Sequence, residues 1–151
     1  MRVITVDPGL STGLAVFNPE GTLQTQQIVG RMDLYRWFEL EAVRDGVTYL
    51  VCENWRPRSG ALTEQVDPHR IIGYLEGRAH FLGWPFHLQN VGDVKKFVTN
   101  EKLKAMGWWV PGQDHARDAL RHLLYFLIHN RHPELAELRG AYVARLAEVL
   151  S

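Results

Sequence analysis

Short runs of β-branched and apolar residues open the chain and predict three strands. They cover residues 2–6, 12–17 and 23–29. The segments between them, residues 7–11 and 18–21, contain the proline and glycine residues that are typical of turns. Because short turns of this kind join antiparallel neighbours, we expect these three strands to form an antiparallel unit.

The middle of the chain alternates between helical and strand patterns. Apolar positions in residues 32–44 recur with a helical spacing. Residues 47–52 form a continuous apolar run, which is typical of a strand covered on both faces. A helix over 68–82, a strand over 85–89 and a short helix over 91–98 are predicted to follow.

The last third of the chain is predicted to be mainly helical. Residues 99–113 contain two glycines and a proline and are interpreted as irregular, whereas residues 114–129 place leucines on one helical face. A final amphipathic helix is predicted over 134–150, after a proline. We therefore expect one α/β domain over residues 1–151, with a mixed five-stranded sheet covered by helices on both faces.

Composition narrows the class of protein. Hydrophobic residues make up 46% and charged residues 23% of the chain, as in soluble globular proteins. No apolar run approaches the roughly 20 residues that span a bilayer, and no cleavable signal opens the chain, so we expect a cytoplasmic protein. Cys52 is the only cysteine and lies in an apolar run, which excludes an intrachain disulfide and indicates a core position.

The net charge argues against a uniformly basic nucleic-acid-binding surface. Seventeen basic residues balance seventeen acidic ones, whereas phosphate contacts usually leave a positive excess. A nuclease that holds metal ions needs carboxylates of its own, however. A neutral total is therefore also compatible with a basic groove beside an acidic pocket.

Three acids occupy positions where they could meet in space. Asp7 and Glu53 each follow an apolar strand, and side chains at strand ends converge when the strands are neighbours. Asp118 lies on the helix predicted over 114–129, with Asp114 and His115 on the same helical face. Carboxylate oxygens are the ligands that Mg²⁺ and Mn²⁺ prefer, so the pattern favours a metal site.

Each of these residues also has an ordinary structural interpretation. Asp7 could form a turn before Pro-Gly, and Glu53 could face solvent beyond its strand. Asp114 could cap the helix, and His115 could be a surface histidine. Their combined order along the chain, rather than any single residue, favours a catalytic interpretation.

Three short motifs resemble the RuvC family of Holliday-junction resolvases, which have a ribonuclease-H-like fold. Residues 3–13 (VITVDPGLSTG) resemble the family's first strand, catalytic aspartate and hairpin. Residues 50–53 (LVCE) resemble its second acidic position, and residues 115–120 (HARDAL) resemble its C-terminal catalytic helix. The resemblance extends over residues 1 to about 130. The compact sequence and the continuation of the last motif by Arg121 and His122 are more similar to phage-encoded relatives than to bacterial ones.

The resemblance implies hydrolysis of branched DNA, above all four-way junctions, by two Mg²⁺ ions about 4 Å apart, for which Mn²⁺ can substitute. Asp7 would bridge the ions, and Glu53 and Asp118 would each complete the coordination of one. His115 would bind a metal or orient the attacking water, and Asp114, one position too early for the motif, would cap the helix or assist. The resemblance further implies a homodimer and no organic cofactor.

Two features depart from the family pattern. The family often has an aromatic residue three positions after the catalytic glutamate, where this chain has Arg56; Trp55 precedes it and could stack on a base or pack beneath its loop. The tail over 134–151 has no role that the resemblance assigns, and it could cover the core or form a dimer contact. Candidate phosphate-binding residues, each of which could equally be solvated, are Arg56, Arg58, Lys95, Lys96, Lys102 and Lys104.

Three alternatives to a junction resolvase remain. A branched-DNA-binding module without catalysis would keep the fold, although all three acids are present. A sugar-kinase or actin-like ATPase has a similar opening strand pattern but needs two such domains, and we expect only one here. A nuclease acting on flaps, forks or RNA–DNA hybrids would have the same fold and metal site.

Overall fold

The computed structural model describes residues 1–56 and 66–130, and further short helical stretches at residues 136, 139–140, 143–144 and 147–148. Arg58 lies outside the described residues, as does much of the helix predicted over 134–150.

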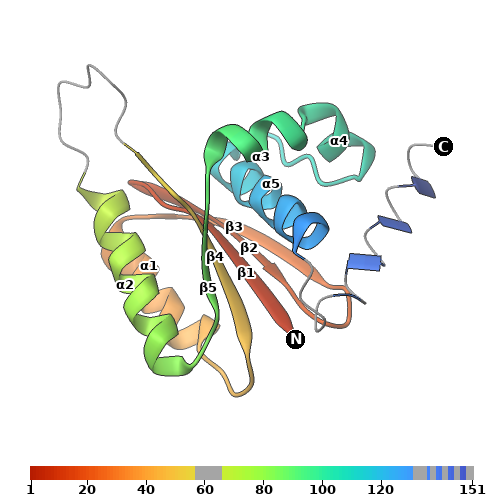
Figure 1. Ribbon diagram of the computed structural model, residues 1–151. Coiled ribbons are helices and arrows are strands. Elements are labelled where there is room, and N and C mark those ends of the chain that lie inside the picture. Colours follow the sequence, from red (N-terminus) through yellow and green to blue (C-terminus); the bar gives the residue numbers. More distant parts are fainter. Residues whose placement is uncertain (57–65, 131–135, 137–138, 141–142, 145–146, 149–151) are drawn as a thin grey trace.

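A mixed five-stranded sheet forms the centre of the molecule (Figure 1). Its strand order is β3-β2-β1-β4-β5; β1, β2 and β3 pair antiparallel, and β4 and β5 run parallel to β1. This confirms the predicted fold class. The elements of the described residues are β1 (Arg2–Asp7), β2 (Ser11–Phe17), β3 (Leu23–Val29), α1 (Arg31–Trp37), the π-helical turn η1 (Phe38–Ala42), β4 (Thr48–Glu53), α2 (Asp67–Leu82), β5 (Phe86–Gln89), α3 (Val91–Phe97), α4 (Asn100–Ala105) and α5 (Asp114–His129).

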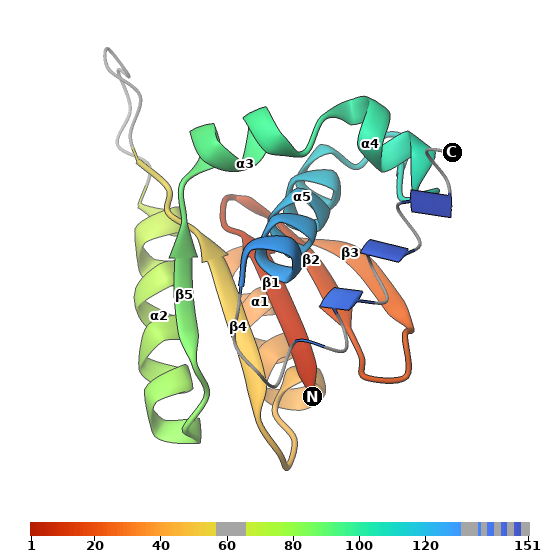
Figure 2. The same cartoon turned by 45° about the vertical axis from the view of Figure 1, so that its right-hand side comes forward.

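Helices cover both faces of the sheet. In Figures 1 and 2, α1 and α2 lie on one face, and α5, with α3 and α4 beside it, lies on the other. Each face has its own core of buried apolar side chains, one shared by the sheet, α1 and α2 and the other by the sheet and α5. Cys52 is fully buried in the first of these cores, as its sequence context predicts.

The pleat of the sheet decides which side chains reach α5. On β1, Ile4 and Val6 belong to the core beneath α1 and α2, whereas Val3 belongs to the core beneath α5. Successive side chains of a strand alternate between faces, so Asp7 continues the series that faces α5. On β4 the same alternation places Glu53 on the face of α5, two residues after Val51.

Polar and small residues form a row across the sheet on this face. Asp7 pairs with Gly13 on β2, Gly13 pairs with Gln27 on β3, and Glu53 pairs with Gln89 on β5. The parallel register of β1 and β4 brings Asp7 and Glu53 to adjacent positions, one residue beyond the last pair of that ladder. All five strands therefore contribute one residue to a single row beneath α5.

The beginning of α5 is fastened directly to this row. The backbone of His115 lies so close to Gly13 that a β-carbon added there would be 1.9 Å from the His115 carbonyl oxygen. Gln27 Oε1 accepts hydrogen bonds from the N–H of His115 at 2.9 Å and from the next N–H at 3.2 Å, which satisfies two otherwise unpaired donors of the helix. Further along, the Thr5 hydroxyl donates to the Ala119 carbonyl at 2.7 Å.

Two predicted elements differ from the structure. The helix predicted over 32–44 begins at Arg31 and changes into the turn η1 at Phe38. The prediction of an irregular segment over 99–113 is wrong for residues 100–105, which form α4. The Thr99 side chain caps this helix by accepting from the Lys102 N–H at 3.3 Å, a local signal that outweighs the glycines further along.

None of the helices in the described part of the chain combines the length and the apolar character needed to cross a membrane.

Substitution Gly13→Ala should destabilise the protein by about 1–3 kcal/mol, because the new methyl group must displace the first turn of α5 from the sheet. Urea unfolding measures this change. Gly73→Ala is the matched control: Gly73 lies within α2 with open space around its α-carbon, so alanine should stabilise that helix by about 0.5–1 kcal/mol. A Gly13→Ala protein as stable as the wild type would contradict the direct contact between α5 and β2.

Candidate active site

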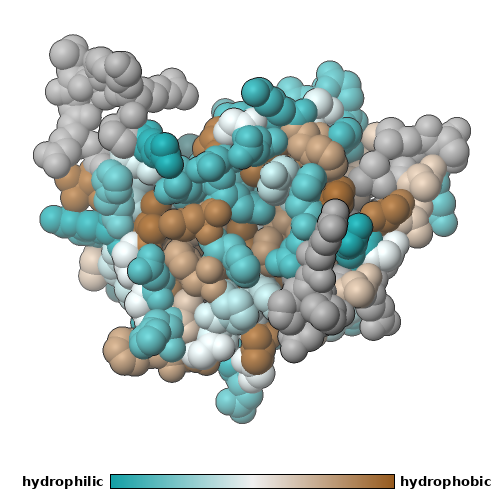
Figure 3. Space-filling model, in the orientation of Figure 1, coloured by the Kyte–Doolittle hydropathy of each residue, from teal (hydrophilic) through white to brown (hydrophobic). Residues whose placement is uncertain are grey.

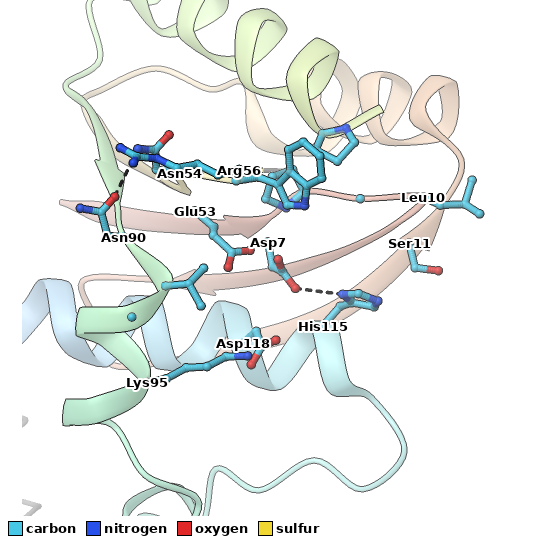
Figure 4. A pocket seen from close by; sticks show the side chains of 16 residues that line it. Asp7, Leu10, Ser11, Glu53, Asn54, Arg56, Asn90, Lys95, His115 and Asp118 are labelled. Atoms are coloured by element: carbon cyan, nitrogen blue, oxygen red, sulfur yellow. Dashed lines mark hydrogen bonds and ion pairs between the residues drawn. The ribbon is translucent and has the colours of Figure 1, made fainter. Parts of the chain in front are cut away.

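A pocket of about 820 Å³ opens where β1 and β4 end and α5 begins (Figure 4). Its position follows from the fold, because ligands of open α/β sheets collect at the carboxyl ends of parallel strands. Side chains from the β1–β2 turn, the end of β4, α2, α3 and α5 surround it. The residues that line it are Asp7, Pro8, Gly9, Leu10, Ser11, Glu53, Asn54, Trp55, Arg56, Pro68, Asn90, Val91, Gly92, Lys95, His115 and Asp118.

Asp7 and His115 are in direct contact. His115 Nδ1 lies 2.9 Å from Asp7 Oδ2, which is hydrogen-bond distance, and Figure 4 shows the two side chains pointing toward one another. The Asp7 side chain is only 7% exposed, whereas that of His115 is 46% exposed. Asp7 therefore orients the imidazole and leaves Nε2 as the ring nitrogen that it does not engage.

Asp7 and Glu53 form a buried pair of acids. Burial is the largest cause that raises the pKa of Asp7 to about 10; hydrogen bonding to Glu53 and the charges of Glu53 and Asp118 act in the same direction, against Lys95. Burial also acts to raise the pKa of Glu53, but the polar contacts with His122 and Asp7 outweigh it and lower the pKa to about 2. At neutral pH and without a bound cation, the pair thus shares one proton.

Asp118, on α5, is the third acid that lines the pocket. Its side chain is 27% exposed, and its Oδ1 lies 3.5 Å from Arg121 Nη1. Arg121 is buried and also donates to the side-chain oxygen of Asn100, the first residue of α4. The guanidinium therefore holds Asp118 from behind while the carboxylate lines the pocket.

Glu53 has a partner on α5 as well. His122 Nε2 lies 3.9 Å from Glu53 Oε1, and the His122 side chain is 2% exposed. Gln89, the residue paired with Glu53 on β5, contacts both the ring and the backbone carbonyl of His122.

The structure brings most of the predicted site residues together. Asp7, Glu53, His115 and Asp118 line the pocket, and so do Trp55, Arg56 and Lys95. Trp55 also makes an edge-to-face contact with His69 of α2, with ring centroids 4.9 Å apart. It therefore packs against α2 at the wall of the pocket.

Other candidates lie away from the pocket. The Asp114 side chain is 79% exposed and pairs with Arg117. Gln113, not Asp114, precedes the first turn of α5, so the alternative of an Asp114 helix cap is not observed. Lys96 is exposed on α3 and does not line the pocket.

Two lysines of α4 are occupied by aromatic contacts. Lys102 Nζ donates to the Phe97 carbonyl at 2.6 Å and lies 4.2 Å from the centre of the Phe97 ring. Lys104 Nζ lies 4.6 Å from the centre of the Trp109 ring. Neither lysine lines the pocket. Figure 3 shows mainly hydrophilic residues along the upper edge of the molecule, where α3 lies in Figure 1.

Four residues that support the site were not identified from the sequence: Gln27, Gln89, Arg121 and His122. The signal for the two on α5 was present, because Arg121 and His122 interrupt a run of leucines at positions that a buried helix face would fill with apolar residues. The glutamines carry no such signal, since each lies at an ordinary position of a short strand.

The donor set fits a divalent cation. In the described residues no group of three His, Cys, Asp or Glu side chains is close enough to enclose an ion. Asp7 and Glu53 are nevertheless buried next to one another with Asp118 nearby, and neighbouring carboxylates resist simultaneous ionisation unless a cation joins them. Oxygen ligands of this kind, with open space for water and phosphate, suit Mg²⁺ or Mn²⁺.

The acid pair makes the stability of the metal-free protein depend on pH. Because the pKa of Asp7 is raised from 3.8 to about 10, the folded state binds more protons than the unfolded state between these values. The free energy of unfolding should therefore fall as the pH rises from about 5 to about 9, by at most about 1.4 kcal/mol per pH unit for this one group. The lowered pKa of Glu53 acts only below about pH 4.5, where its contribution is lost as the pH falls.

Asp7→Asn is the comparison that isolates this effect, measured by urea unfolding in EDTA at several pH values. The wild type should lose stability relative to Asp7→Asn as the pH rises, because the amide cannot ionise beside Glu53. Parallel pH profiles for the two proteins would show that the pKa of Asp7 is not raised in the folded protein.

Comparison with known proteins shows which solved structures share this fold. No family model matches the sequence, and no curated protein sequence is significantly similar to it. Solved structures do match: Thermus thermophilus RuvC in complex with a Holliday junction substrate has 16% sequence identity and a TM-score of 0.55, over 97% of this chain and 96% of that chain. A second structure of Thermus thermophilus RuvC has 18% identity and a TM-score of 0.52, over 97% of each chain. The chain therefore has a RuvC-like, ribonuclease-H-like fold, as its motifs predict.

Proposed function

We propose that this protein is a metal-dependent endonuclease that cleaves branched DNA, with the four-way junction as its main substrate. The observation that carries the proposal is the meeting of Asp7, Glu53 and Asp118, from β1, β4 and α5, around one open pocket. The RuvC-like fold supports it, since a structure of that fold is a complex with a Holliday junction substrate. A fold hosts many functions, so the acids of the pocket carry more weight than the fold.

Mg²⁺, or Mn²⁺ in its place, would stabilise the charge that develops on the scissile phosphate and activate the attacking water, with two ions in each site. Asp7 would contact both ions from the sheet. Glu53 would complete the ligands of one ion and Asp118 those of the other. The approach of the three carboxylates from different elements leaves the open side of the pocket for the phosphate.

His115 is suited to handle the proton of the attacking water. Its Nδ1 is held by Asp7. When a bound cation ionises Asp7, a neutral His115 that donates its Nδ1–H to this carboxylate would present an unprotonated Nε2. Nε2 would then accept a proton from the attacking water, or orient this water toward the phosphorus atom. Its partly exposed side chain at the pocket wall is consistent with this role.

The walls of the pocket offer contacts for DNA. Lys95 reaches the acids from α3, and Arg56 lies on the opposite wall after β4 (Figure 4). We assign phosphate contacts to these two residues first, since each additional phosphate neutralised strengthens binding and its salt dependence. Lys96, Lys102 and Lys104 would contribute at longer range from the surface of α3 and α4. Trp55 could stack on an unpaired base at the pocket wall.

Resolution of a junction requires two cuts, so we propose that the active species is a homodimer with two sites related by a two-fold axis. A nuclease specific for flaps, forks or RNA–DNA hybrids would use the same acids. Cleavage assays on a panel of these substrates distinguish it from a junction resolvase.

Asp7→Asn should retain binding to four-way junction DNA while Mg²⁺-dependent cleavage falls by more than about 10²-fold, the scale of a single preorganised electrostatic group. Binding should persist because the substitution leaves the basic side chains of the pocket walls, Arg56 and Lys95, unchanged. Gel-shift assays in Ca²⁺ and cleavage assays in Mg²⁺ measure the two properties separately.

Asp114→Asn is the matched control, because Asp114 lies on the same helix as Asp118 but outside the pocket. It should cut junctions at close to the wild-type rate. Cleavage by Asp7→Asn at the wild-type rate would contradict the proposed site. A wild-type protein that binds junctions but cuts no branched substrate with Mg²⁺ or Mn²⁺ would instead identify a non-catalytic binding module.

A further inference from the structure

His122 is a buried polar side chain that the proposed chemistry does not use. It lies on α5 one turn beyond Asp118 and two turns beyond His115, so all three face the same side of the helix. Its side chain is 2% exposed. A buried imidazole needs polar neighbours at both ring nitrogens. Nδ1 lies within hydrogen-bond distance of Gln89, and Nε2 faces Glu53 at 3.9 Å.

The position of Gln89 indicates which nitrogen of a neutral His122 ring carries the proton. One side-chain nitrogen of Gln89 lies 2.9 Å from the His122 carbonyl oxygen and 3.1 Å from His122 Nδ1. A carbonyl oxygen can only accept, so the Gln89 atom beside it must be the amide nitrogen and not the amide oxygen. That nitrogen can only donate, and Nδ1 must therefore be an acceptor without a proton.

The proton of the neutral ring is consequently on Nε2, the nitrogen that faces Glu53. Nε2 lies 3.9 Å from Glu53 Oε1, a distance at which the N–H attracts the carboxylate electrostatically and a small rotation of Glu53 would form a hydrogen bond. If the proton were on Nδ1, two acceptors would face each other across this gap. Gln89 thus decides whether His122 attracts or repels Glu53.

The pairing of strands makes this arrangement possible. Glu53 and Gln89 are direct neighbours on β4 and β5, and both lie on the face covered by α5. One strand pair therefore presents the acid and the amide side by side, and the helix above inserts the imidazole between them.

We propose that Gln89 and His122 form a positioning relay that holds the Glu53 carboxylate in the orientation required to bind a divalent metal ion. The proposal rests on the proposed function, in which Glu53 is a metal ligand. His122 is a positioning residue, because it contacts Glu53 and not the substrate. The relay fixes Glu53 from behind, as Arg121 does for Asp118, so that each acid beside Asp7 has a buried basic partner on α5.

Partners of this kind behind a metal ligand typically contribute about 10- to 100-fold to metal affinity or activity. His122→Phe keeps a ring of similar size but has no N–H for Glu53, and we expect it to weaken Mn²⁺ binding about 10- to 100-fold. His122→Gln can place an N–H near the position of Nε2 and should recover most of this loss. Gln89→Met, which cannot donate to Nδ1, should show an intermediate loss.

The experiment is a Mn²⁺ titration of the full chain by isothermal calorimetry, with His129→Phe as the matched control. His129 lies at the end of the same helix, is exposed and stacks on Tyr125, so this substitution should leave Mn²⁺ affinity unchanged. Near-ultraviolet circular dichroism checks that each variant is folded. Normal Mn²⁺ affinity in folded His122→Phe, or no recovery in His122→Gln, would overturn the relay while leaving the proposed function intact.

A second measurement needs no substitution at His122. Long-range ¹H–¹⁵N NMR of the wild-type protein reports which ring nitrogen carries the proton, and we expect Nε2–H in the wild type and a mixture of forms in Gln89→Met. A wild-type ring protonated on Nδ1 alone would overturn the relay even if His122→Phe failed to fold. Absence of Mn²⁺ binding by the wild type would instead overturn the proposed function together with the relay.

Discussion

The close contact between α5 and the sheet at Gly13 positions the whole site. Only a residue without a side chain allows the first turn of the helix to lie directly on β2, and Gln27 then caps that turn from β3. From this fixed point the helix crosses the row formed by all five strands. His115 meets Asp7 near the start of the crossing, and His122 meets Glu53 and Gln89 two turns later. A shift of α5 would separate these pairs together.

The acids of this row oppose folding in the metal-free protein, although the proposed function requires them. Two carboxyl groups buried side by side raise the free energy of the metal-free protein, and the raised pKa of Asp7 is the sign of that cost. A divalent cation would relieve it. The surrounding basic groups act from two sides, because Lys95 faces the acids across the pocket, whereas Arg121 and His122 hold Asp118 and Glu53 from within the core. The fold thereby keeps Asp7, Glu53 and Asp118 around one pocket before any ligand binds.

Much of this arrangement could be predicted from the sequence, because strand and helix periodicity are local signals. The apolar runs ending at Asp7 and Glu53 indicated neighbouring strands, and the spacing of His115 and Asp118 indicated one helical face. Residues whose role depends on strand register could not be identified from the sequence. Gln89, for example, lies beside Glu53 only because β5 pairs with β4 in a particular alignment. Conversely, the sequence could not tell that Asp114 turns outward, or that Lys102 and Lys104 are engaged by aromatic rings.

The proposed activity depends on three acids, far apart in the sequence, binding a metal ion together. The most direct measurement is anomalous X-ray diffraction from crystals of the protein soaked in Mn²⁺. We expect anomalous density inside the pocket, within coordination distance of Asp7, Glu53 and Asp118. Manganese bound elsewhere, or a pocket that remains free of manganese at saturating concentration, would contradict the shared metal site.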